Sequence, residues 1–165
     1  MEPSIETRTE QPYVGITSFV TMQNFGPVIE AHSRVFGWLA ARGVEPAGAP
    51  FFRYHTIDMQ RELEVEAGVP VPPGSAVPAS DEEVTAGVLP AGRYAVVEHV
   101  GHPDTLVQAT GDLLAWAEKQ GLQWDNEPGE RGEKWGARLE FYETDPEVEP
   151  DMSKWLTVLA FRLAD

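Results

Sequence analysis

The sequence has no cysteine among its 165 residues. This absence excludes disulfide bonds, thiolate nucleophiles, cysteine-ligated zinc and iron-sulfur clusters. Basic residues are also scarce, because 12 lysines and arginines stand against 27 aspartates and glutamates, which gives a formal net charge of -15. Such a charge repels phosphate backbones and anionic membrane surfaces. We therefore expect no direct nucleic acid partner and no membrane partner.

Long apolar runs are missing as well. No stretch approaches the roughly 20 apolar residues of a membrane-spanning helix, and the polar, acidic residues 1–10 do not resemble a signal peptide. The cytoplasm is the expected location. Hydrophobic residues nevertheless make up 42% of the chain, which is enough for a buried core in one compact domain. We expect that domain to be a monomer.

The motifs of several common enzyme classes are absent. No serine stands in the Gly-x-Ser-x-Gly context of a nucleophile elbow, and no glycine-rich phosphate loop occurs. His99 and His102 lie close to Glu98, but no second ligand cluster accompanies them and no His-Glu-x-x-His arrangement is present. The sequence therefore predicts no metal site, no cofactor and no acyl-enzyme or nucleotide-hydrolysing chemistry.

What the sequence does contain is one order of elements, β-α-β-β, that occurs twice. The first set consists of a strand at 11–22, a helix at 27–42, and strands at 51–57 and 63–71. The second set consists of a strand at 87–100, a helix at 103–119, and strands at 135–143 and 155–163. The two helix ends also align without gaps, with Trp-x4-Gly in both at a spacing of 78 residues. Duplication of one module explains both observations.

These patterns predict a specific organisation. Residues 1–10 are expected to be a flexible N-terminus, followed by a single domain at 11–165. Within it we expect module one at 11–71, a linker at 72–86 rich in proline and acidic residues, and module two at 87–165. The predicted fold class is α+β, with the tandem modules related by a pseudo-two-fold axis in one antiparallel sheet. Both helices would cover one face, leaving a ligand cleft on the other.

A carboxylate and a tyrosine stand on one side of the predicted strand at 135–143. Alternation groups Arg138, Glu140 and Tyr142 on one face and the apolar side chains on the other, which we expect to meet the helices. A partly desolvated glutamate on the open face can pair with a cation or act as a general base. The alternative is a solvated strand face with a weak Arg138–Glu140 surface pair.

Module one offers two possible partners for this carboxylate. Phe52, Tyr54 and Thr56 share one face of the strand at 51–57, and Glu64 lies on the neighbouring predicted strand. Tyr54 and Glu64 are therefore candidates for the same site as Glu140. The alternative for Glu64 is again structural, since acids at every second position are typical of the solvated side of a strand.

Several segments in a fixed order resemble the gyrase-inhibitor-like (GyrI-like) small-molecule-binding domains. This family also forms the effector-binding domains of multidrug-responsive transcription regulators. The matching segments are Leu89–Ala95 with His99-Val100-Gly101, the Leu-x-x-Trp-Ala helix before Gly121, Leu139–Pro146 with Trp155-x-Thr157, and Gly43–Gly48 with Gly68–Val71. Together they extend across nearly the whole chain.

The resemblance implies a concave sheet that binds bulky aromatic, often cationic compounds. Glu140 would be the central carboxylate, Tyr142 follows in the same motif, and Trp155 would line the pocket. Two departures change the expected pocket. His102-Pro103 stands where the family more usually has Pro-Tyr, which puts an aromatic rim contact in doubt, and Val158 replaces a second glutamate of many members.

Three functions remain open at this point. The first is a stand-alone multidrug-binding protein for lipophilic aromatic or cationic compounds, with Glu140, Tyr142, Tyr54, Trp155 and Glu64 as ligand-binding residues. The second, also implied by the family, is a hydrolase of cyclopropane-containing or other electrophilic toxins, with Glu140 and Tyr142 as catalytic residues. The third is a DNA gyrase inhibitor. Because the modules occupy 11–165, no room is expected for a DNA-binding region, so direct transcription control is not predicted.

Overall fold

The computed structural model describes residues 2–58, 60–75 and 83–165. These residues form ten strands and two α-helices, joined in places by short 3-10 turns. The first part contains β1 (Ser4–Arg8), β2 (Gln11–Val20), α1 (Gly26–Ala41), β3 (Phe51–Ile57), β4 (Leu63–Pro70) and β5 (Thr85–Leu89). The second contains β6 (Gly92–Val100), α2 (Leu106–Lys119), β7 (Asn126–Gly129), β8 (Gly132–Trp135), β9 (Arg138–Tyr142) and β10 (Leu156–Arg162).

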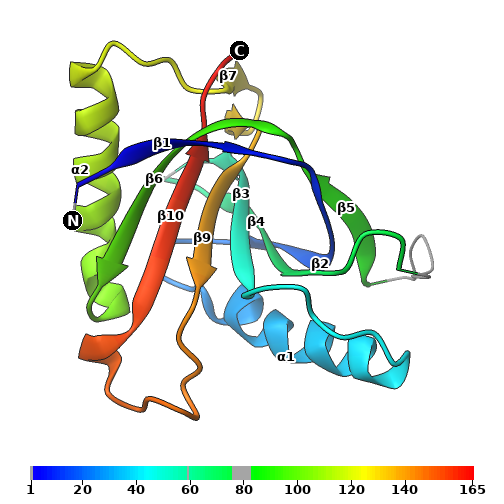
Figure 1. Cartoon of the computed structure of the whole chain (residues 1–165). Coiled ribbons are helices and arrows are strands. Elements are labelled where there is room, and N and C mark those ends of the chain that lie inside the picture. Colours follow the sequence, from blue (N-terminus) through cyan, green and yellow to red (C-terminus); the bar gives the residue numbers. More distant parts are fainter. Residues whose placement is uncertain (1, 59, 76–82) are drawn as a thin grey trace.

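The strands form one curled, antiparallel sheet in the order β1-β6-β10-β9-β3-β4-β2-β5, to which the β7–β8 hairpin is attached through β3 (Figure 1). The order is symmetric about the central pair of β9 and β3. Each half consists of three strands: β2, β3 and β4 in one, and β6, β9 and β10 in the other. The strand that precedes one half in the sequence pairs with the outer edge of the other half. β1 therefore pairs with β6, and β5 pairs with β2. The α+β class and the antiparallel sheet are confirmed.

Both helices pack on the same face of the sheet. α1 buries Val28, Ala31, Val35 and Leu39 against the half formed by β2 and β4. α2 buries Leu106, Leu113 and Ala117 against the half formed by β6 and β10. Ile57 and Tyr142 contact both of these clusters, which shows that the two helices share one face, as the sequence predicts. The opposite face carries a separate cluster that includes Tyr13, Phe51, Tyr94 and Leu139.

The N-terminal residues differ from the expected flexible segment. Ser4–Arg8 form the edge strand β1, which pairs with β6 along its whole length. Its side chains are mostly exposed, so no apolar alternation marks it in the sequence. The strand is held instead by backbone pairing and by Arg8, whose guanidinium lies 5.6 Å from the ring of Tyr94 and 5.5 Å from that of Phe141.

The expected strand at 87–100 is two strands, because Pro90 and Ala91 interrupt it. Proline has no N–H to donate to a sheet ladder, which explains the break at this position. The break lets the chain leave β5 in one half of the sheet and enter β6 in the other. Of the expected linker at 72–86, residues 76–82 lie outside the described part, and Thr85 and Ala86 already belong to β5.

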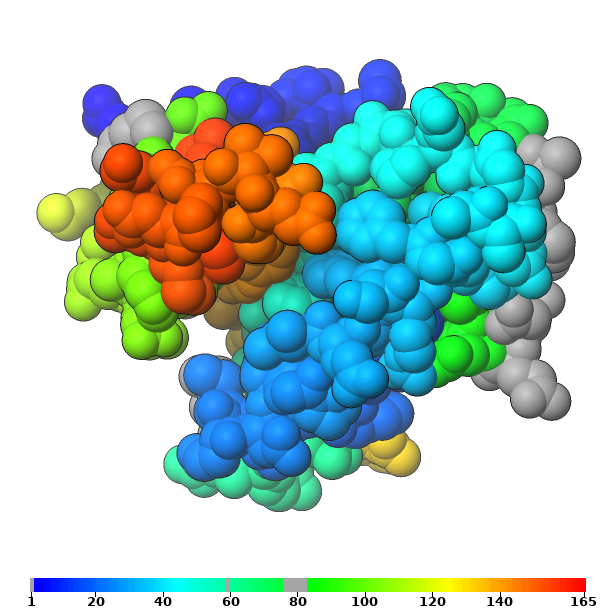
Figure 2. Space-filling model, turned by 90° about the horizontal axis from the view of Figure 1, so that it is seen from below, coloured from blue at the N-terminus to red at the C-terminus, as the bar shows by residue number. Residues whose placement is uncertain are grey.

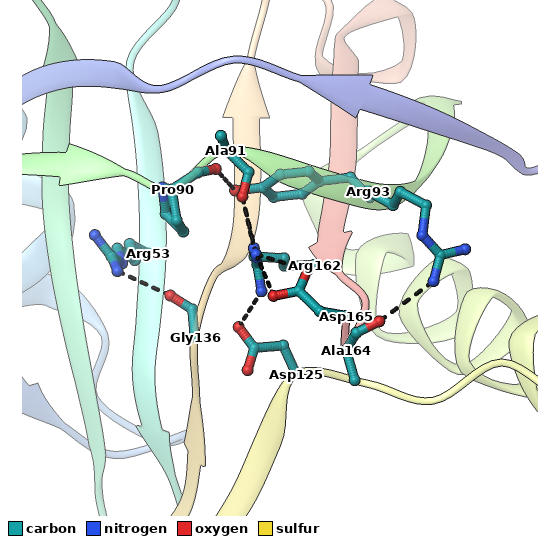
Figure 3. A network of polar contacts seen from close by, with 10 residues as sticks. Arg53, Pro90, Ala91, Arg93, Asp125, Gly136, Arg162, Ala164 and Asp165 are labelled. Carbon is teal, nitrogen blue, oxygen red and sulfur yellow. Dashed lines mark hydrogen bonds and ion pairs between the residues drawn. The ribbon is translucent and has the colours of Figure 1, made fainter.

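The expected strand at 135–143 is also divided. An added Cβ at Gly136 would lie 1.8 Å from the carboxylate of Asp125, so only glycine lets these segments approach each other. Figure 3 shows the surrounding polar network, in which Arg53 donates to the Gly136 carbonyl at 2.8 Å and Arg162 pairs with Asp125 at 2.9 Å. Arg162 also bonds to the Ala91 carbonyl, which ties β10 to the start of β6.

The division at Gly136 changes which face each side chain occupies. Trp135 packs in the cluster under α2, whereas Ala137 and Leu139 belong to the cluster on the opposite face. The prediction that the apolar side chains of 135–143 meet the helices is therefore wrong for Ala137, Leu139 and Phe141. Within the described residues, neither helix is long and apolar enough to span a membrane.

Candidate functional site

Glu140 lies in the middle of the sheet, on the face that carries the helices. It is directly opposite Phe52 of β3 on one side and Leu159 of β10 on the other. Phe52 packs in the cluster under α1, and Leu159 packs in the cluster under α2. Glu140 therefore sits between the two helices, not on the face away from them as predicted. Its side chain is nearly buried, with 8% of the residue surface exposed.

Two tyrosines donate hydrogen bonds to one oxygen of this carboxylate. The hydroxyl of Tyr142 lies 2.6 Å from Oε1 of Glu140, and that of Tyr54 lies 2.9 Å from the same atom. Tyr142 is two residues after Glu140 in β9, and Tyr54 is two residues after Phe52 in the antiparallel β3. The phenols thus reach Glu140 from both strands of the central pair. Oε2 accepts no hydrogen bond from any described residue.

Burial dominates the electrostatics of this cluster. It raises the pKa of Glu140, and the two phenolic hydrogen bonds and the nearby Arg138 only partly offset this effect. Burial and the adjacent carboxylate also raise the pKa values of Tyr54 and Tyr142 well above the ordinary value. Both phenols therefore remain protonated donors, and Glu140 holds a proton more readily than an exposed glutamate does.

Aromatic rings that were not singled out in the sequence surround the cluster. Phe25, which precedes α1, lies 5.7 Å from the ring of Phe52 and 6.3 Å from that of Tyr54. His32 of α1 stacks on Phe52 at 4.8 Å, and Tyr142 contacts Phe52 edge-on at 5.2 Å. Burial lowers the pKa of His32, so this ring adds aromatic surface rather than positive charge. In the sequence, the alternation that placed Phe52 on the same strand face as Tyr54 was the only indication of any of these contacts.

Arg138 lies on the same strand and the same face as Glu140, but the surface pair weighed from the sequence is not formed. Its guanidinium lies 4.7 Å from the ring centroid of Trp135 and 4.7 Å from that of Phe161. It makes no hydrogen bond or ion pair with any described residue. A stacked, unpaired cation thus lies two residues from the carboxylate.

The helical face is hollowed beside this cluster. Figure 2 shows a hollow between the segment that joins β9 to β10, in orange, and the start of α1, in blue. Tyr142 ends β9 at the beginning of the first segment, and Phe25 immediately precedes α1. Tyr142 and Phe25 therefore adjoin the two segments that border the hollow, whereas Phe52 and Tyr54 lie on β3.

Glu64 is not brought to this site. A β-bulge between Tyr54 and Thr56 shifts the pairing of β3 with β4, so Thr56 leaves the face of Tyr54 and donates to Oε1 of Glu64 at 3.1 Å. On β4, Leu63 and Val65 face the helices, which directs Glu64 to the opposite face. Tyr54 pairs with Val65 before the bulge and shares its face, so Tyr54 and Glu64 lie on opposite faces of the sheet.

Trp155 lies just before β10, and its indole N–H donates to the carbonyl of Glu149 at 2.6 Å. This bond fixes the segment between β9 and β10. Among the described residues, no ring contact or hydrogen bond joins Trp155 to Glu140 or its two tyrosines.

The histidines considered for metal binding have other partners. His99 lies 2.7 Å from the hydroxyl of Thr105, and Nδ1 of His102 accepts from the backbone N–H of Asp104 at 3.0 Å. No group of three or more metal-binding side chains is present in the described part of the chain.

A second buried carboxylate, Glu66, was missed in the sequence. It lies on the face opposite the helices, where Oε1 accepts from the hydroxyl of Tyr13 at 2.5 Å and lies 2.8 Å from Nε2 of His55. Arg53 in turn donates to the Tyr13 hydroxyl at 3.0 Å. The alternating acids of β4 suggested a solvated face, and nothing in that pattern distinguishes the 4% exposed Glu66 from its neighbours.

The opposite face also has a hollow, of about 460 Å³, beside β1. Leu139 and Phe141 line it together with Arg8, Tyr94 and Glu143. Glu140 is not part of its wall, because it points to the other side of β9. The two faces therefore offer separate concave surfaces, and only the helical one lies beside the Glu140 cluster.

Solved structures with the same fold align with 99% of this chain. The isolated C-terminal domain of EcmrR matches with a TM-score of 0.79 at 18% identity and is covered to 98%. The EcmrR chain of a DNA complex matches with a TM-score of 0.77 at 17% identity, and this protein spans 57% of its length. SAV2435 bound to tetraphenylphosphonium matches with a TM-score of 0.61 at 13% identity over 94% of that chain.

A hydrolase from Listeria innocua matches with a TM-score of 0.64 at 12% identity, and 92% of its chain is covered. At such identities these structures establish a common fold. No curated protein matches the sequence significantly. The family profile of the GyrI-like small molecule binding domain matches residues 1–133. The chain therefore belongs to the GyrI-like small-molecule-binding domains.

Proposed function

We propose that this protein binds bulky aromatic compounds that carry a positive charge, with Glu140 as the charge partner. The observation that carries the proposal is the nearly buried carboxylate between two phenols. Both phenols occupy Oε1, so Oε2 remains without a hydrogen bond from the described residues. A carboxylate in a desolvated position attracts a cation much more strongly than one in water does.

The surroundings of Glu140 favour an aromatic ligand. Phe25, Phe52 and Tyr142 present ring faces and edges within one connected cluster. Aromatic surfaces attract cations through their quadrupoles and pack well against other rings. A lipophilic cation would thus gain both charge pairing and ring contacts in the same place.

The comparisons support the class of ligand. The family is one of small-molecule-binding domains, and the SAV2435 structure contains tetraphenylphosphonium, an aromatic cation. The net charge of -15 adds a long-range attraction for such compounds. We place this binding in the cytoplasm, with Tyr54 and Tyr142 as contacts and Trp155 as a contact only if its segment moves toward the ligand.

The direct test is titration with tetraphenylphosphonium and with tetraphenylborate, which has the same shape and the opposite charge. We expect saturable binding of the phosphonium and an affinity at least about tenfold lower in Glu140→Gln, since loss of one charge contact costs about 1.4 kcal/mol or more. Glu64→Gln, a glutamate of the same sheet on the other face, is the matched control. Equal phosphonium affinities in wild type and Glu140→Gln would refute the proposal.

A hydrolase is the second candidate, favoured by the raised pKa of Glu140 beside two phenolic donors. In this reaction Glu140 would accept a proton from water while the water oxygen bonds to a cyclopropane carbon. The ring C–C bond would break, and Tyr142 would protonate the group that receives its electron pair. Incubation with a cyclopropane-bearing electrophile and mass analysis decide between the two functions. Unchanged ligand in wild type rejects hydrolysis, and a hydrated product that Glu140→Gln no longer forms supports it.

A further inference from the structure

We propose that Arg138 is a second charged contact in the Glu140 site, so that the preferred ligand is an aromatic zwitterion with a cationic centre and an anionic group. This inference rests on the proposed function and specifies its ligand class. It assigns to Arg138 the anionic group of the ligand and to Glu140 the cationic centre.

The placement of Arg138 supports a role in the site. β9 runs from Arg138 to Tyr142 without interruption, so Arg138 and Glu140 are on the same face of one strand, about 7 Å apart along it. Arg138 is directly opposite Phe161 of β10, which packs in the cluster under α2. The guanidinium is therefore on the helical face, on the α2 side of Glu140.

The contacts of Arg138 fix its orientation but leave its donors available. Two rings hold the guanidinium, each with its centroid 4.7 Å away. None of its N–H groups bonds to a described residue. The nearby Glu133, which could compete for it, accepts the indole N–H of Trp135 at 2.7 Å instead.

The guanidinium donors, which no described residue accepts, are available to an acceptor on a ligand. A partly buried guanidinium normally pairs with a carboxylate or with carbonyl oxygens, because its desolvation is otherwise uncompensated. Burial lowers the pKa of Arg138, and the charges of Tyr54, Glu140 and Glu133 only partly offset this effect. Arginine recognises planar anions with two parallel hydrogen bonds, so a ligand carboxylate is the group that fits best.

A purely cationic ligand would meet both charges. It would be attracted by Glu140 and repelled by Arg138, since both groups act within the same low-dielectric region. A zwitterion with its charges suitably spaced would pair with both groups. The strand spacing of about 7 Å between these side chains sets the scale of that separation.

The test compares rhodamine B, a zwitterion at neutral pH, with its ethyl ester, a cation with the same fluorophore. In fluorescence anisotropy titrations we expect wild type to bind the acid at least about tenfold more tightly than the ester. Arg138→Met should lose this preference, because the substitution should lower the affinity for the acid and not the affinity for the ester. Glu140→Gln should weaken both dyes.

Matched variants separate this effect from general damage. Arg8→Met removes an arginine that also stacks on two rings, but on the other face, and should leave both affinities unchanged. Arg138→Lys keeps the charge without the planar fork and should retain only part of the preference, which keeps the test decisive if Arg138→Met unfolds. Equal binding of both dyes by wild type, or an intact preference in both Arg138 variants, overturns the inference. Neither result affects the phosphonium test, which compares wild type with Glu140→Gln.

Discussion

Two nearly buried glutamates lie on opposite faces of the same sheet with similar partners. Glu140 faces the helices and is 8% exposed, whereas Glu66 faces away from them and is 4% exposed. Each carboxylate has two side-chain partners on its Oε1 atom. These partners are Tyr54 and Tyr142 for Glu140, and Tyr13 and His55 for Glu66. The partners of the Oε1 atoms therefore do not distinguish a structural glutamate from one that is available to a ligand.

The arginine near each carboxylate makes the difference. Arg53, on the side of Glu66, donates to the Tyr13 hydroxyl and to the carbonyls of Val88 and Gly136, and only its Nε is buried without a partner. Arg138, on the side of Glu140, makes no hydrogen bond with a described residue. The network of Glu66 thus joins several strands to one another. Near Glu140, by contrast, the guanidinium of Arg138 remains available to a ligand.

The largest expected effect comes from breaking the network of Glu66. Glu66→Gln should lower the free energy of unfolding by about 2–3 kcal/mol, because it weakens charged hydrogen bonds in a buried site. Glu140→Gln should change it by less than about 1 kcal/mol, because its oxygen still accepts both phenols and the buried charge is removed. Urea denaturation of both variants measures the difference. Equal losses would contradict the division into a structural and an available glutamate.

A smaller effect is expected from crowding Glu66 without changing its charge. A methyl group at Gly15 would lie 2.8 Å from Oε2 of Glu66 and 2.9 Å from the carbonyl of Ala67. Gly15→Ala should therefore lower the free energy of unfolding by about 1–3 kcal/mol. Gly111→Ala on α2, where nothing lies within 4 Å of the added group, should be neutral or stabilising by up to about 1 kcal/mol. Thermal denaturation that ranks them in the reverse order would show that Glu66 has room to move.

The smallest expected effect is a difference between wild type and Glu140→Gln in how the free energy of unfolding depends on pH. Because burial raises the pKa of Glu140, the folded state binds this proton more readily than the unfolded chain does. The resulting stabilisation is fully present below the ordinary pKa of glutamate and disappears as the pH rises through the raised value. The stability of wild type relative to Glu140→Gln should therefore fall as the pH rises above about 4, the ordinary pKa of glutamate. Urea denaturation at several pH values tests this, and parallel profiles would contradict it.

The sequence predicted those parts of the fold that depend on local patterns. Helical spacing located both helices, and alternation located the strands at the centre of each half. The strand β1 had no apolar alternation, and the breaks at Pro90 and Gly136 serve long-range contacts with the other half of the sheet and with Asp125. Such features depend on residues distant in sequence, so local periodicity could not reveal them.

The candidate site was predictable to a similar extent. Alternation and the family resemblance singled out Glu140, Tyr142 and Tyr54, and the structure joins them by hydrogen bonds. The face was wrong because the division at Gly136 ended the alternation on which it was based. Glu64 was grouped with the wrong residues, because Tyr54 pairs with Val65 and shares its helical face, whereas Glu64 points to the opposite face. The buried Glu66 has no local signature, since its burial depends on Tyr13 from another strand.

The central claim is that Glu140, and not Glu66, is the carboxylate available to a ligand. The most direct measurement is carbon-13 NMR of the glutamate carboxyl groups during titration with tetraphenylphosphonium, with Glu140→Gln and Glu66→Gln used for assignment. The account predicts a saturable shift of the Glu140 signal and unchanged Glu66 and Glu64 signals. A shift of Glu66 with a stationary Glu140 would contradict it and place the ligand on the opposite face of the sheet.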